Sequence, residues 1–315
     1  MTKLGLLFPG QGAQRVGMGK DFYDAFSIAK ETFAHADDLL HTNLTKLIFE
    51  GPSEELSLTK NCQIAIYVTS CALWNVIKQE FGDITPFACA GLSLGEYTAL
   101  TAAHVLPFEE GMKLVKMRGE LMHSSSVKNP GSMSVVLGMT EEAVEKEIAP
   151  LRPKQHVWIA NLNCPGQVVI SGSKEGLEAA AGVLKTAGAK RVLPLDVSGA
   201  FHSEFMAEAK EFLKEAIEAT SFSDPACKVV MNVPGDFVES TGDIQENLVK
   251  QVVAPVYWEK GIHKLEESGV TTYLEVGPGK TLAGMNKRIG VAGSTISVET
   301  VKDLKALEGI HAASK

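Results

Sequence analysis

The chain has 315 residues, of which 45% are hydrophobic and 22% are charged. This length and balance exclude a small disulfide-stabilised scaffold and a disordered chain, and they predict one large domain or two modest ones. The net charge of -8 gives the surface as a whole no affinity for nucleic acid or for an anionic membrane.

The five cysteines never stand in a C-x-x-C pair, which argues against a disulfide framework and against a zinc site. The apolar run before Pro9 is too short for the core of a signal peptide. No apolar stretch reaches the length of a transmembrane helix, because even residues 64–77 include Thr69, Ser70 and Asn75. We therefore expect a cytoplasmic protein in a reducing compartment, with residues 64–77 as a buried helix.

Short apolar runs alternate with amphipathic stretches in the first half of the chain. The expected elements are a strand at 4–8, a helical region to about 47, the buried helix, a strand at 86–90 and a helix from about 96. This alternation is typical of a parallel sheet flanked by helices.

The pattern changes between about 130 and 198. Strands are expected at 133–137, 156–162, 167–171 and 191–197, and helices at 141–151 and 174–187. Thr140 is the expected N-cap of the first helix, and Cys164-Pro165-Gly166 is short enough to join the second and third strands as a hairpin. The resulting βαββαβ order is that of a ferredoxin-like unit.

The last third returns to the first pattern, with a helix at 205–219 and strands at 228–232 and 272–276. We therefore predict an α/β fold in which residues 1–129 and 199–315 form a larger, α/β-hydrolase-like catalytic domain with a parallel sheet. Residues 130–198 form an inserted ferredoxin-like subdomain. A small-molecule site is expected in the cleft between the two.

The segment Gly91-Leu92-Ser93-Leu94-Gly95 matches G-x-S-x-G between an expected strand and an expected helix, which is the context of a nucleophile elbow. Such a turn strains the serine backbone, and the flanking glycines keep side chains out of the crowded turn. The amides of the following helix point to the same place, so the Leu94 N–H is the expected donor to a developing anion. An ordinary serine in a strand-to-helix turn is the alternative for so short a motif.

A serine nucleophile needs a base, which is most often histidine. His202 is the candidate base, because it lies where the expected insert ends and the chain re-enters the cleft. That position alone also suits a structural histidine, and no acidic partner is evident, so a backbone carbonyl is the alternative means of orienting the imidazole. The other histidines have no supporting motif and are most simply surface or packing residues: His35, His41, His104, His123, His156, His263 and His311.

Several motifs, in order along nearly the whole chain, resemble the malonyl-CoA:acyl carrier protein transacylase family, which loads the extender unit in fatty-acid and polyketide synthesis. Each segment is weak alone, and their combination makes the resemblance specific. The segments are Phe8-Pro9-Gly10-Gln11-Gly12-Ala13-Gln14, Gly91-Leu92-Ser93-Leu94-Gly95-Glu96-Tyr97, Met117-Arg118-Gly119, Gly199-Ala200-Phe201-His202-Ser203, Gln251 and Glu275-Val276-Gly277-Pro278-Gly279.

The resemblance implies a role for each catalytic group. Ser93 takes the malonyl group as an ester, and His202 activates the serine and later protonates the departing thiol. The main-chain carbonyl of Gln251 orients the histidine, which accounts for the missing acid. The N–H groups of Gln11 and Leu94 form the oxyanion hole.

The resemblance further implies that Arg118 binds the free carboxylate of malonate. The planar, bidentate fork of arginine suits this role in a partly dry pocket. Without the resemblance, Arg118 is a solvated or salt-bridged residue on the helix that carries Lys113 and Lys116.

Four further residues are candidates for the wall of the acyl pocket. Phe201 fits the family variant associated with malonyl over branched extenders. Asn161 and Asn163 are candidate lining residues, with hydrogen bonding to a turn backbone as the alternative. Leu92 stands where many family members have histidine, and we expect it to adjust acyl preference or hydration without abolishing transfer.

The expected activity is ping-pong transfer of malonyl from malonyl-CoA to the phosphopantetheine thiol of an acyl carrier protein, supplying fatty-acid synthesis. We expect no cofactor, no metal, no nucleic-acid or membrane partner, and a monomer. The acidic carrier protein is expected to meet Lys190 and Arg191 or Lys287 and Arg288. The alternatives are a serine hydrolase (thioesterase or esterase) and a non-catalytic scaffold that binds carrier proteins.

Three other motifs fail on inspection. Gly279-Lys280-Thr281 is not a phosphate loop, because Leu274 stands where the upstream glycine belongs. Gly10-Gln11-Gly12 is not a dinucleotide fingerprint, because Arg15 occupies the third glycine position. The H-E-x-x-H spacing of a zinc site is also missing from the sequence.

Overall fold

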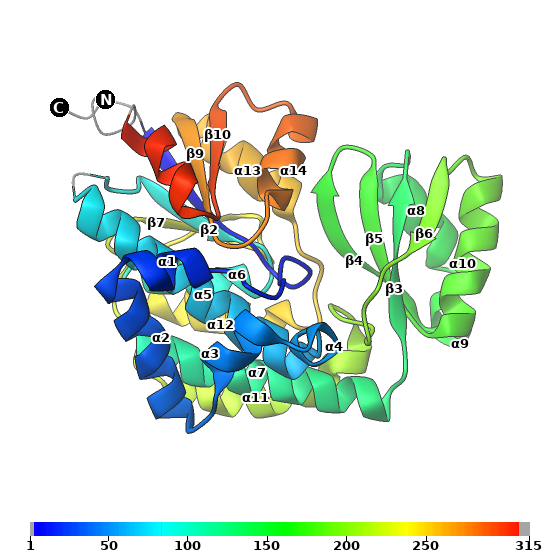
Figure 1. The fold of residues 1–315 in the computed structure, drawn as a ribbon. Coiled ribbons are helices and arrows are strands. Elements are labelled where there is room, and N and C mark those ends of the chain that lie inside the picture. The colour runs from blue at the N-terminus through cyan, green and yellow to red at the C-terminus, as the bar shows by residue number, and fades with distance from the viewer. Residues whose placement is uncertain (1–2, 83, 309–315) are drawn as a thin grey trace.

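The computed structural model describes residues 3–82 and 84–308 and places them around two separate β-sheets, each covered by helices (Figure 1). The predicted mixed α/β class is confirmed. The larger sheet has six strands in the order β10-β9-β1-β2-β7-β8. These strands are β1 (Lys3–Phe8), β2 (Ala88–Gly91), β7 (Lys228–Met231), β8 (Asp236–Val238), β9 (Val270–Val276) and β10 (Ser294–Val298).

The larger sheet is parallel except at one edge. The pairs β10–β9, β9–β1, β1–β2 and β2–β7 are parallel, whereas β8 returns antiparallel to β7. The connection from β7 to β8 is a short turn with Gly235 at φ 55°, and so short a connection permits only an antiparallel return. The central strands β1 and β2 are buried almost throughout, as expected for strands covered by helices on both faces.

The smaller sheet is antiparallel in the order β4-β5-β3-β6 and stands apart at the right of Figure 1. Its elements follow the predicted βαββαβ order, with the short α9 added after α8. They are β3 (Ser132–Leu137), α8 (Glu141–Ile148), α9 (Arg152–Gln155), β4 (Val157–Cys164), β5 (Gln167–Gly172), α10 (Lys174–Thr186) and β6 (Arg191–Pro194).

The first helix of this segment shows why the predicted boundaries shift. Thr140 is its N-cap and accepts a hydrogen bond from the Ala143 N–H, as predicted. The helix was expected to continue to residue 151, but α8 ends at Ile148. Pro150 accounts for the difference, because a proline has no N–H with which to continue the helical hydrogen bonds.

Helices cover the larger sheet, and the predicted buried helix is one of them. That helix is α5 (Thr59–Glu80), which is longer at both ends than residues 64–77 and packs against α2 (Ser27–Leu40) and α7 (Phe108–Lys128). The other helices here are α1 (Lys20–Ala25), α3 (Leu44–Glu50), α4 (Ser53–Leu56), α6 (Gly95–Ala102), α11 (Ala207–Ala219), α12 (Thr241–Gln251), α13 (Trp258–Glu267) and α14 (Thr281–Ile289), with 3₁₀ turns at Glu204–Met206 and Val301–Leu307.

Two further observations concern the helices and the cysteines. None of the helices in the described part of the chain is long and apolar enough to cross a bilayer. All five cysteines are free thiols, and four of them are buried.

Candidate active site

The turn between β2 and α6 has the geometry that the G-x-S-x-G motif predicts. Ser93 has a backbone φ of 52°, in the left-handed region that residues other than glycine rarely adopt. A Cβ on Gly91 would lie 1.9 Å from the Gly95 carbonyl carbon, and a Cβ on Gly95 would lie 2.2 Å from the Phe8 oxygen. Only glycine therefore fits at either position, and the turn holds Ser93 at the carboxyl end of the parallel sheet.

The structure brings the predicted base to the predicted nucleophile. The Nε2 atom of His202 lies 2.8 Å from Ser93 Oγ, although the two residues are 109 positions apart. The Nδ1 atom of His202 lies 2.8 Å from the main-chain oxygen of Gln251, the last residue of α12. Because a carbonyl can only accept, Nδ1 carries the proton, and Nε2 is left as the acceptor for the Ser93 hydroxyl.

His202 is a neutral base in this setting. It is 4% exposed, and burial together with the charge of Arg118 lowers the pKa of His202 to about 4, against the raising effect of the Gln251 backbone. The imidazole is therefore unprotonated at neutral pH and can accept the serine proton.

Arg118 is not on a solvated face, as the alternative interpretation had it. Its side chain is buried, with 1% of its surface exposed. Its Nη2 atom donates to Ser93 Oγ at 3.0 Å and to Gln251 Oε1 at 2.9 Å. Its Nη1 atom donates to Gln63 Oε1. The Cζ atom of the guanidinium lies over the Tyr97 ring, 5.8 Å from the ring centroid. Among the described residues the buried Nε has no hydrogen-bond acceptor.

The two predicted oxyanion donors lie beside Ser93. Gln11 follows β1 in a loop that contacts the elbow, since a Cβ on Gly10 would lie 2.3 Å from the Leu92 oxygen. Leu94 is the N-cap of α6 and is fully buried. Within residues 3–82 and 84–308, neither the Gln11 nor the Leu94 N–H is bonded to an acceptor, so both are free to bind an oxyanion.

A cavity of about 190 Å³ opens in front of Ser93 and lies between the two sheets, where the cleft was predicted. The four predicted wall residues line it: Leu92, Asn161, Asn163 and Phe201. Arg118, predicted to bind the substrate carboxylate, is not among the residues that line the cavity. Asn161 and Asn163 lie on β4 rather than in the hairpin turn, and the buried Oδ1 of Asn163 has no partner in the described part of the chain.

Sequence reasoning missed three polar residues that complete the site. Gln63 is a buried polar residue on the otherwise apolar α5 and holds Arg118 Nη1. Asn232 directly follows β7, where its Oδ1 accepts from the Ser93 N–H at 2.7 Å and its Nδ2 donates to the Gly91 oxygen at 2.7 Å. Glu96 was noted only as part of a motif. Polar residues at the carboxyl ends of parallel strands were the available signal for Asn232.

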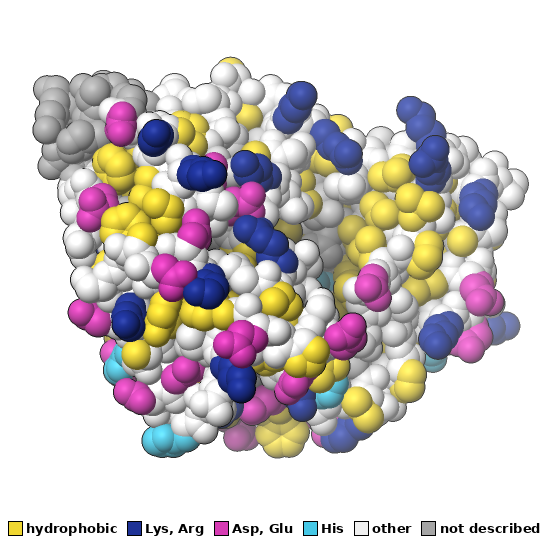
Figure 2. Space-filling view, viewed as in Figure 1, with side chains coloured by type: hydrophobic (Ala, Val, Ile, Leu, Met, Phe, Trp, Pro, Cys, Tyr) yellow, Lys and Arg dark blue, Asp and Glu magenta, His cyan; other side chains and the backbone are white. Residues whose placement is uncertain are grey.

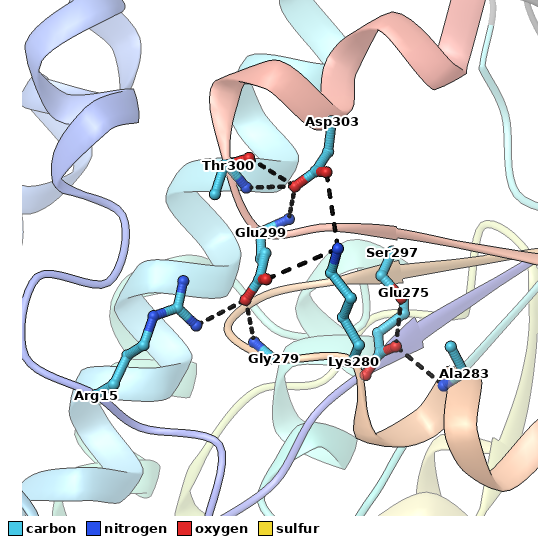
Figure 3. A network of polar contacts seen from close by, with 9 residues as sticks. All are labelled: Arg15, Glu275, Gly279, Lys280, Ala283, Ser297, Glu299, Thr300 and Asp303. Atoms are coloured by element: carbon cyan, nitrogen blue, oxygen red, sulfur yellow. Dashed lines mark hydrogen bonds and ion pairs between the residues drawn. The ribbon is translucent and has the colours of Figure 1, made fainter.

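The last motif, around Glu275, supports the site without entering it. Figure 3 shows Glu275 against Ala283 and Ser297; its two oxygens accept from the Leu282 N–H at 2.9 Å, the Ala283 N–H at 3.0 Å and the Ser297 hydroxyl at 2.8 Å. Glu299 accepts from the Gly279 N–H at 2.9 Å and from Arg15 at 2.7 Å (Figure 3). These bonds fix the start of α14, a helix that lines the cavity with Thr281 and Met285.

The other histidines that the structure describes take no part in this site. His202 is the one histidine among the described residues that lines the cavity. His35 and His263 lie at the surface beside glutamates. His311 lies outside the described residues.

The fold and the serine–histidine pair define an acyltransferase, and the chain belongs to the acyl transferase domain family, whose model matches residues 6–302. It is 45% identical over 299 residues to the malonyl CoA-acyl carrier protein transacylase of Bacillus subtilis (strain 168), covering 95% of this chain and 94% of that protein. The Escherichia coli (strain K12) protein of the same name is 41% identical over 290 residues, covering 92% and 93%.

Solved structures agree with these relatives. A malonyl-transacylase in complex with a type II PKS acyl-carrier protein superposes with a TM-score of 0.94 at 39% identity, covering 98% of this chain and 100% of that one. An acyl carrier protein S-malonyltransferase from Vibrio cholerae has a TM-score of 0.92 at 38% identity, covering 97% and 100%. The resemblance drawn from the sequence motifs is confirmed.

Proposed function

We propose that this chain transfers the malonyl group of malonyl-CoA to the phosphopantetheine thiol of an acyl carrier protein, through a malonyl ester on Ser93. One observation carries the proposal: a buried guanidinium, that of Arg118, lies 3.0 Å from the Oγ of a serine that is bonded to a neutral histidine. A buried cation with a free N–H suits an acyl group that ends in a carboxylate. A hydrolase of neutral esters has no use for it.

In the first half-reaction, Ser93 Oγ attacks the thioester carbonyl while His202 Nε2 takes the hydroxyl proton. The oxygen of the tetrahedral intermediate is stabilised by the N–H groups of Gln11 and Leu94. When the intermediate collapses, the carbon–sulfur bond breaks, and His202 returns the proton to the sulfur of coenzyme A.

The second half-reaction runs the same steps in reverse with a new thiol. His202 removes the proton of the phosphopantetheine thiol, the thiolate attacks the malonyl ester, and Ser93 leaves with the proton from His202. Each proton and each developing charge is handled by this chain's own groups, so we propose that no metal or other cofactor takes part.

The wall residues adjust which acyl group is accepted. Phe201 and Leu92 present apolar surface to the methylene of malonate, and the ring of Phe201 would crowd an α-methyl group. Asn161 and Asn163 supply polar atoms at the small-sheet side of the cavity. A single methyl group is worth only about 1–3 kcal/mol, so the preference against branched extenders is modest.

The finer fold description belongs to the same proposal. We assign residues 1–129 and 199–315 to an α/β-hydrolase-like catalytic domain and 130–198 to a ferredoxin-like subdomain, supported by the mainly parallel and the antiparallel strand orders. We also propose a monomer that works in the cytoplasm.

Mass spectrometry of the intact chain after mixing with malonyl-CoA tests the proposal. We expect a covalent malonyl adduct on the peptide that contains Ser93, its loss when carrier protein is added, and no adduct in Ser93→Ala. An adduct that water removes as fast as carrier protein does indicates a hydrolase. A chain that binds carrier protein and never acquires an adduct is a scaffold.

We propose that the acidic carrier protein docks on two basic pairs, one of which lies on a helix that lines the cavity. Lys287 and Arg288 lie in the last turn of α14, the helix that lines the cavity, and Lys190 and Arg191 lie at the start of β6. All four side chains are exposed, and none forms an ion pair with a described carboxylate. Figure 2 shows Lys and Arg side chains on both sides of the hollow between the two halves of the molecule.

Reversing the charge of both pairs to glutamate should raise the KM for carrier protein by about tenfold at low salt, because rim charges steer association. Coenzyme A release in a single turnover with malonyl-CoA should not change, since the first half-reaction does not need the carrier. Added salt should reduce the difference between the variant and the parent chain. An unchanged carrier KM rules this surface out.

A further inference from the structure

Glu96 is a buried carboxylate that the serine–histidine chemistry above does not use. It is 1% exposed and lies in the first turn of α6, immediately after the elbow that carries Ser93. Its Oε1 accepts from the Asn232 main-chain N–H at 2.6 Å, and its Oε2 accepts from Gln251 Nε2 at 2.6 Å. Both oxygens therefore bind polar groups of the active site.

The bonding pattern is that of an ionised carboxylate. Burial raises the pKa of Glu96 to about 8, although the Asn232 N–H, the Arg118 charge and the Gln251 amide oppose part of the rise. The geometry of its hydrogen bonds favours the charged form. Both oxygens face N–H donors, so a proton on either oxygen would meet a donor instead of an acceptor. The helix N-terminus on which Glu96 lies also favours negative charge.

The carboxamide of Gln251 stands between Glu96 and Arg118. Its Nε2 donates to Glu96 and to the Ser93 main-chain oxygen at 2.9 Å, and its Oε1 accepts from Arg118 Nη2. The amide thus points its positive end at the carboxylate and its negative end at the guanidinium. It links two opposite charges that form no direct ion pair among the described residues.

This arrangement matters because a direct Glu–Arg pair would occupy the N–H groups that a ligand carboxylate needs. With the amide between them, Glu96 offsets part of the cost of burying Arg118 and holds the guanidinium in place. The Nε of Arg118 stays without an acceptor in the described part of the chain. The guanidinium is therefore held in place with this N–H unpaired.

We propose that Glu96 is a positioning residue that acts through the Gln251 carboxamide on Arg118 and thereby sets the preference for acyl groups that carry a carboxylate. This inference rests on the proposed function, because it takes Arg118 as the group that binds the malonyl carboxylate. Glu96 touches neither Ser93 Oγ nor His202. Its effect is therefore on which acyl group is loaded.

The test is Glu96→Gln, scored as the ratio of Ser93 loading rates with malonyl-CoA and acetyl-CoA. A glutamine has the same volume but offers only one acceptor oxygen, because its second terminal atom is an N–H₂ donor. This donor must face another donor, either the Asn232 N–H or the Gln251 N–H₂. Since the main chain cannot turn away, the Gln251 side chain should move and release Arg118. We expect the ratio to fall by about 10- to 100-fold, the range for hydrogen bonds to charged groups.

Glu275→Gln is the matched control. Glu275 is also a fully buried carboxylate that accepts main-chain N–H bonds, but its partners lie on α14 and β10. We expect this control to lower thermal stability and to change the two loading rates by the same factor, because Glu275 fixes a helix of the cavity wall and has no bond to Arg118. In an Arg118→Ala background, Glu96→Gln should cause no further fall in the ratio, because the group it positions is gone.

An equal loss of malonyl and acetyl loading in Glu96→Gln overturns the proposal, and so does a fall in the ratio that persists without Arg118. If Glu96→Gln does not fold, Glu96→Asp is the second variant, because it retains both acceptors on a shorter side chain. An unchanged ratio of malonyl to acetyl loading in Glu96→Asp contradicts the proposal. A parent chain that shows no preference for malonyl-CoA instead contradicts the proposed function itself.

Discussion

Arg118→Ala should lower kcat/KM for malonyl-CoA by about 30- to 5,000-fold, because truncating one partner of a buried charge pair costs roughly 2–5 kcal/mol. Loading with acetyl-CoA should fall much less, since acetate has no carboxylate to bind. The quantity to measure is coenzyme A release in a single turnover with each thioester, together with the mass of the adduct on Ser93.

Arg118→Lys is the informative companion variant. Lysine keeps the positive charge but has neither the planar fork nor the reach to hold Gln63 and Gln251 together, so malonyl loading should recover only in part. Because Arg118 also donates to Ser93 Oγ, some loss is expected with every substrate. A loss of equal size with malonyl-CoA and acetyl-CoA would contradict the carboxylate-binding role.

His202→Ala should slow acylation of Ser93 by about 10⁴- to 10⁶-fold, the range found when the base of a serine nucleophile is removed. No other described histidine lines the cavity to replace it. The adduct with malonyl-CoA should still form over long incubation, because Ser93 and the oxyanion donors remain. Retention of more than a hundredth of the rate would mean that another group is the base.

The pH dependence gives an independent check on the same residue. Burial and Arg118 lower the pKa of His202 to about 4, so the rate of acylation should fall only as the pH drops through that value. Arg118→Ala removes one of the two causes and should move the acid limb toward the ordinary histidine pKa of about 6.5. An acid limb near 6.5 in the parent chain would show that the imidazole is better hydrated than its burial indicates.

The site could be predicted from sequence where the local chain carries the signal. The elbow is such a place, because Gly91 and Gly95 are required by contacts within a few residues and with β1. Thr140 is another, since an N-cap acts on its own helix. The helix α12 was missed although Ser240 and Asp243 form a recognisable cap at its start.

The rest of the site depends on contacts between distant segments. No sequence pattern around Gln63 indicates that its amide accepts a hydrogen bond from Arg118, which lies 55 positions further along the chain. Asn232 binds the Ser93 N–H across 139 residues, and Glu96 meets Gln251 across 155. The burial of Arg118 could not be predicted either, because Lys113 and Lys116 on the same helix indicate a solvent-exposed face. Such contacts follow from the sheet order, which the local patterns of a single sequence do not reveal.

The end of α12 has one more consequence. The carbonyl that orients His202 belongs to the last turn of that helix, where main-chain oxygens have no partner within the helix and carry its partial negative charge. The imidazolium that forms during each half-reaction therefore faces a counter-charge made of peptide dipoles. Unlike the aspartate of a triad, this counter-charge neither takes up a proton in acid nor disappears when the side chain at 251 is replaced. Tuning it by evolution or design requires a shift of the helix itself.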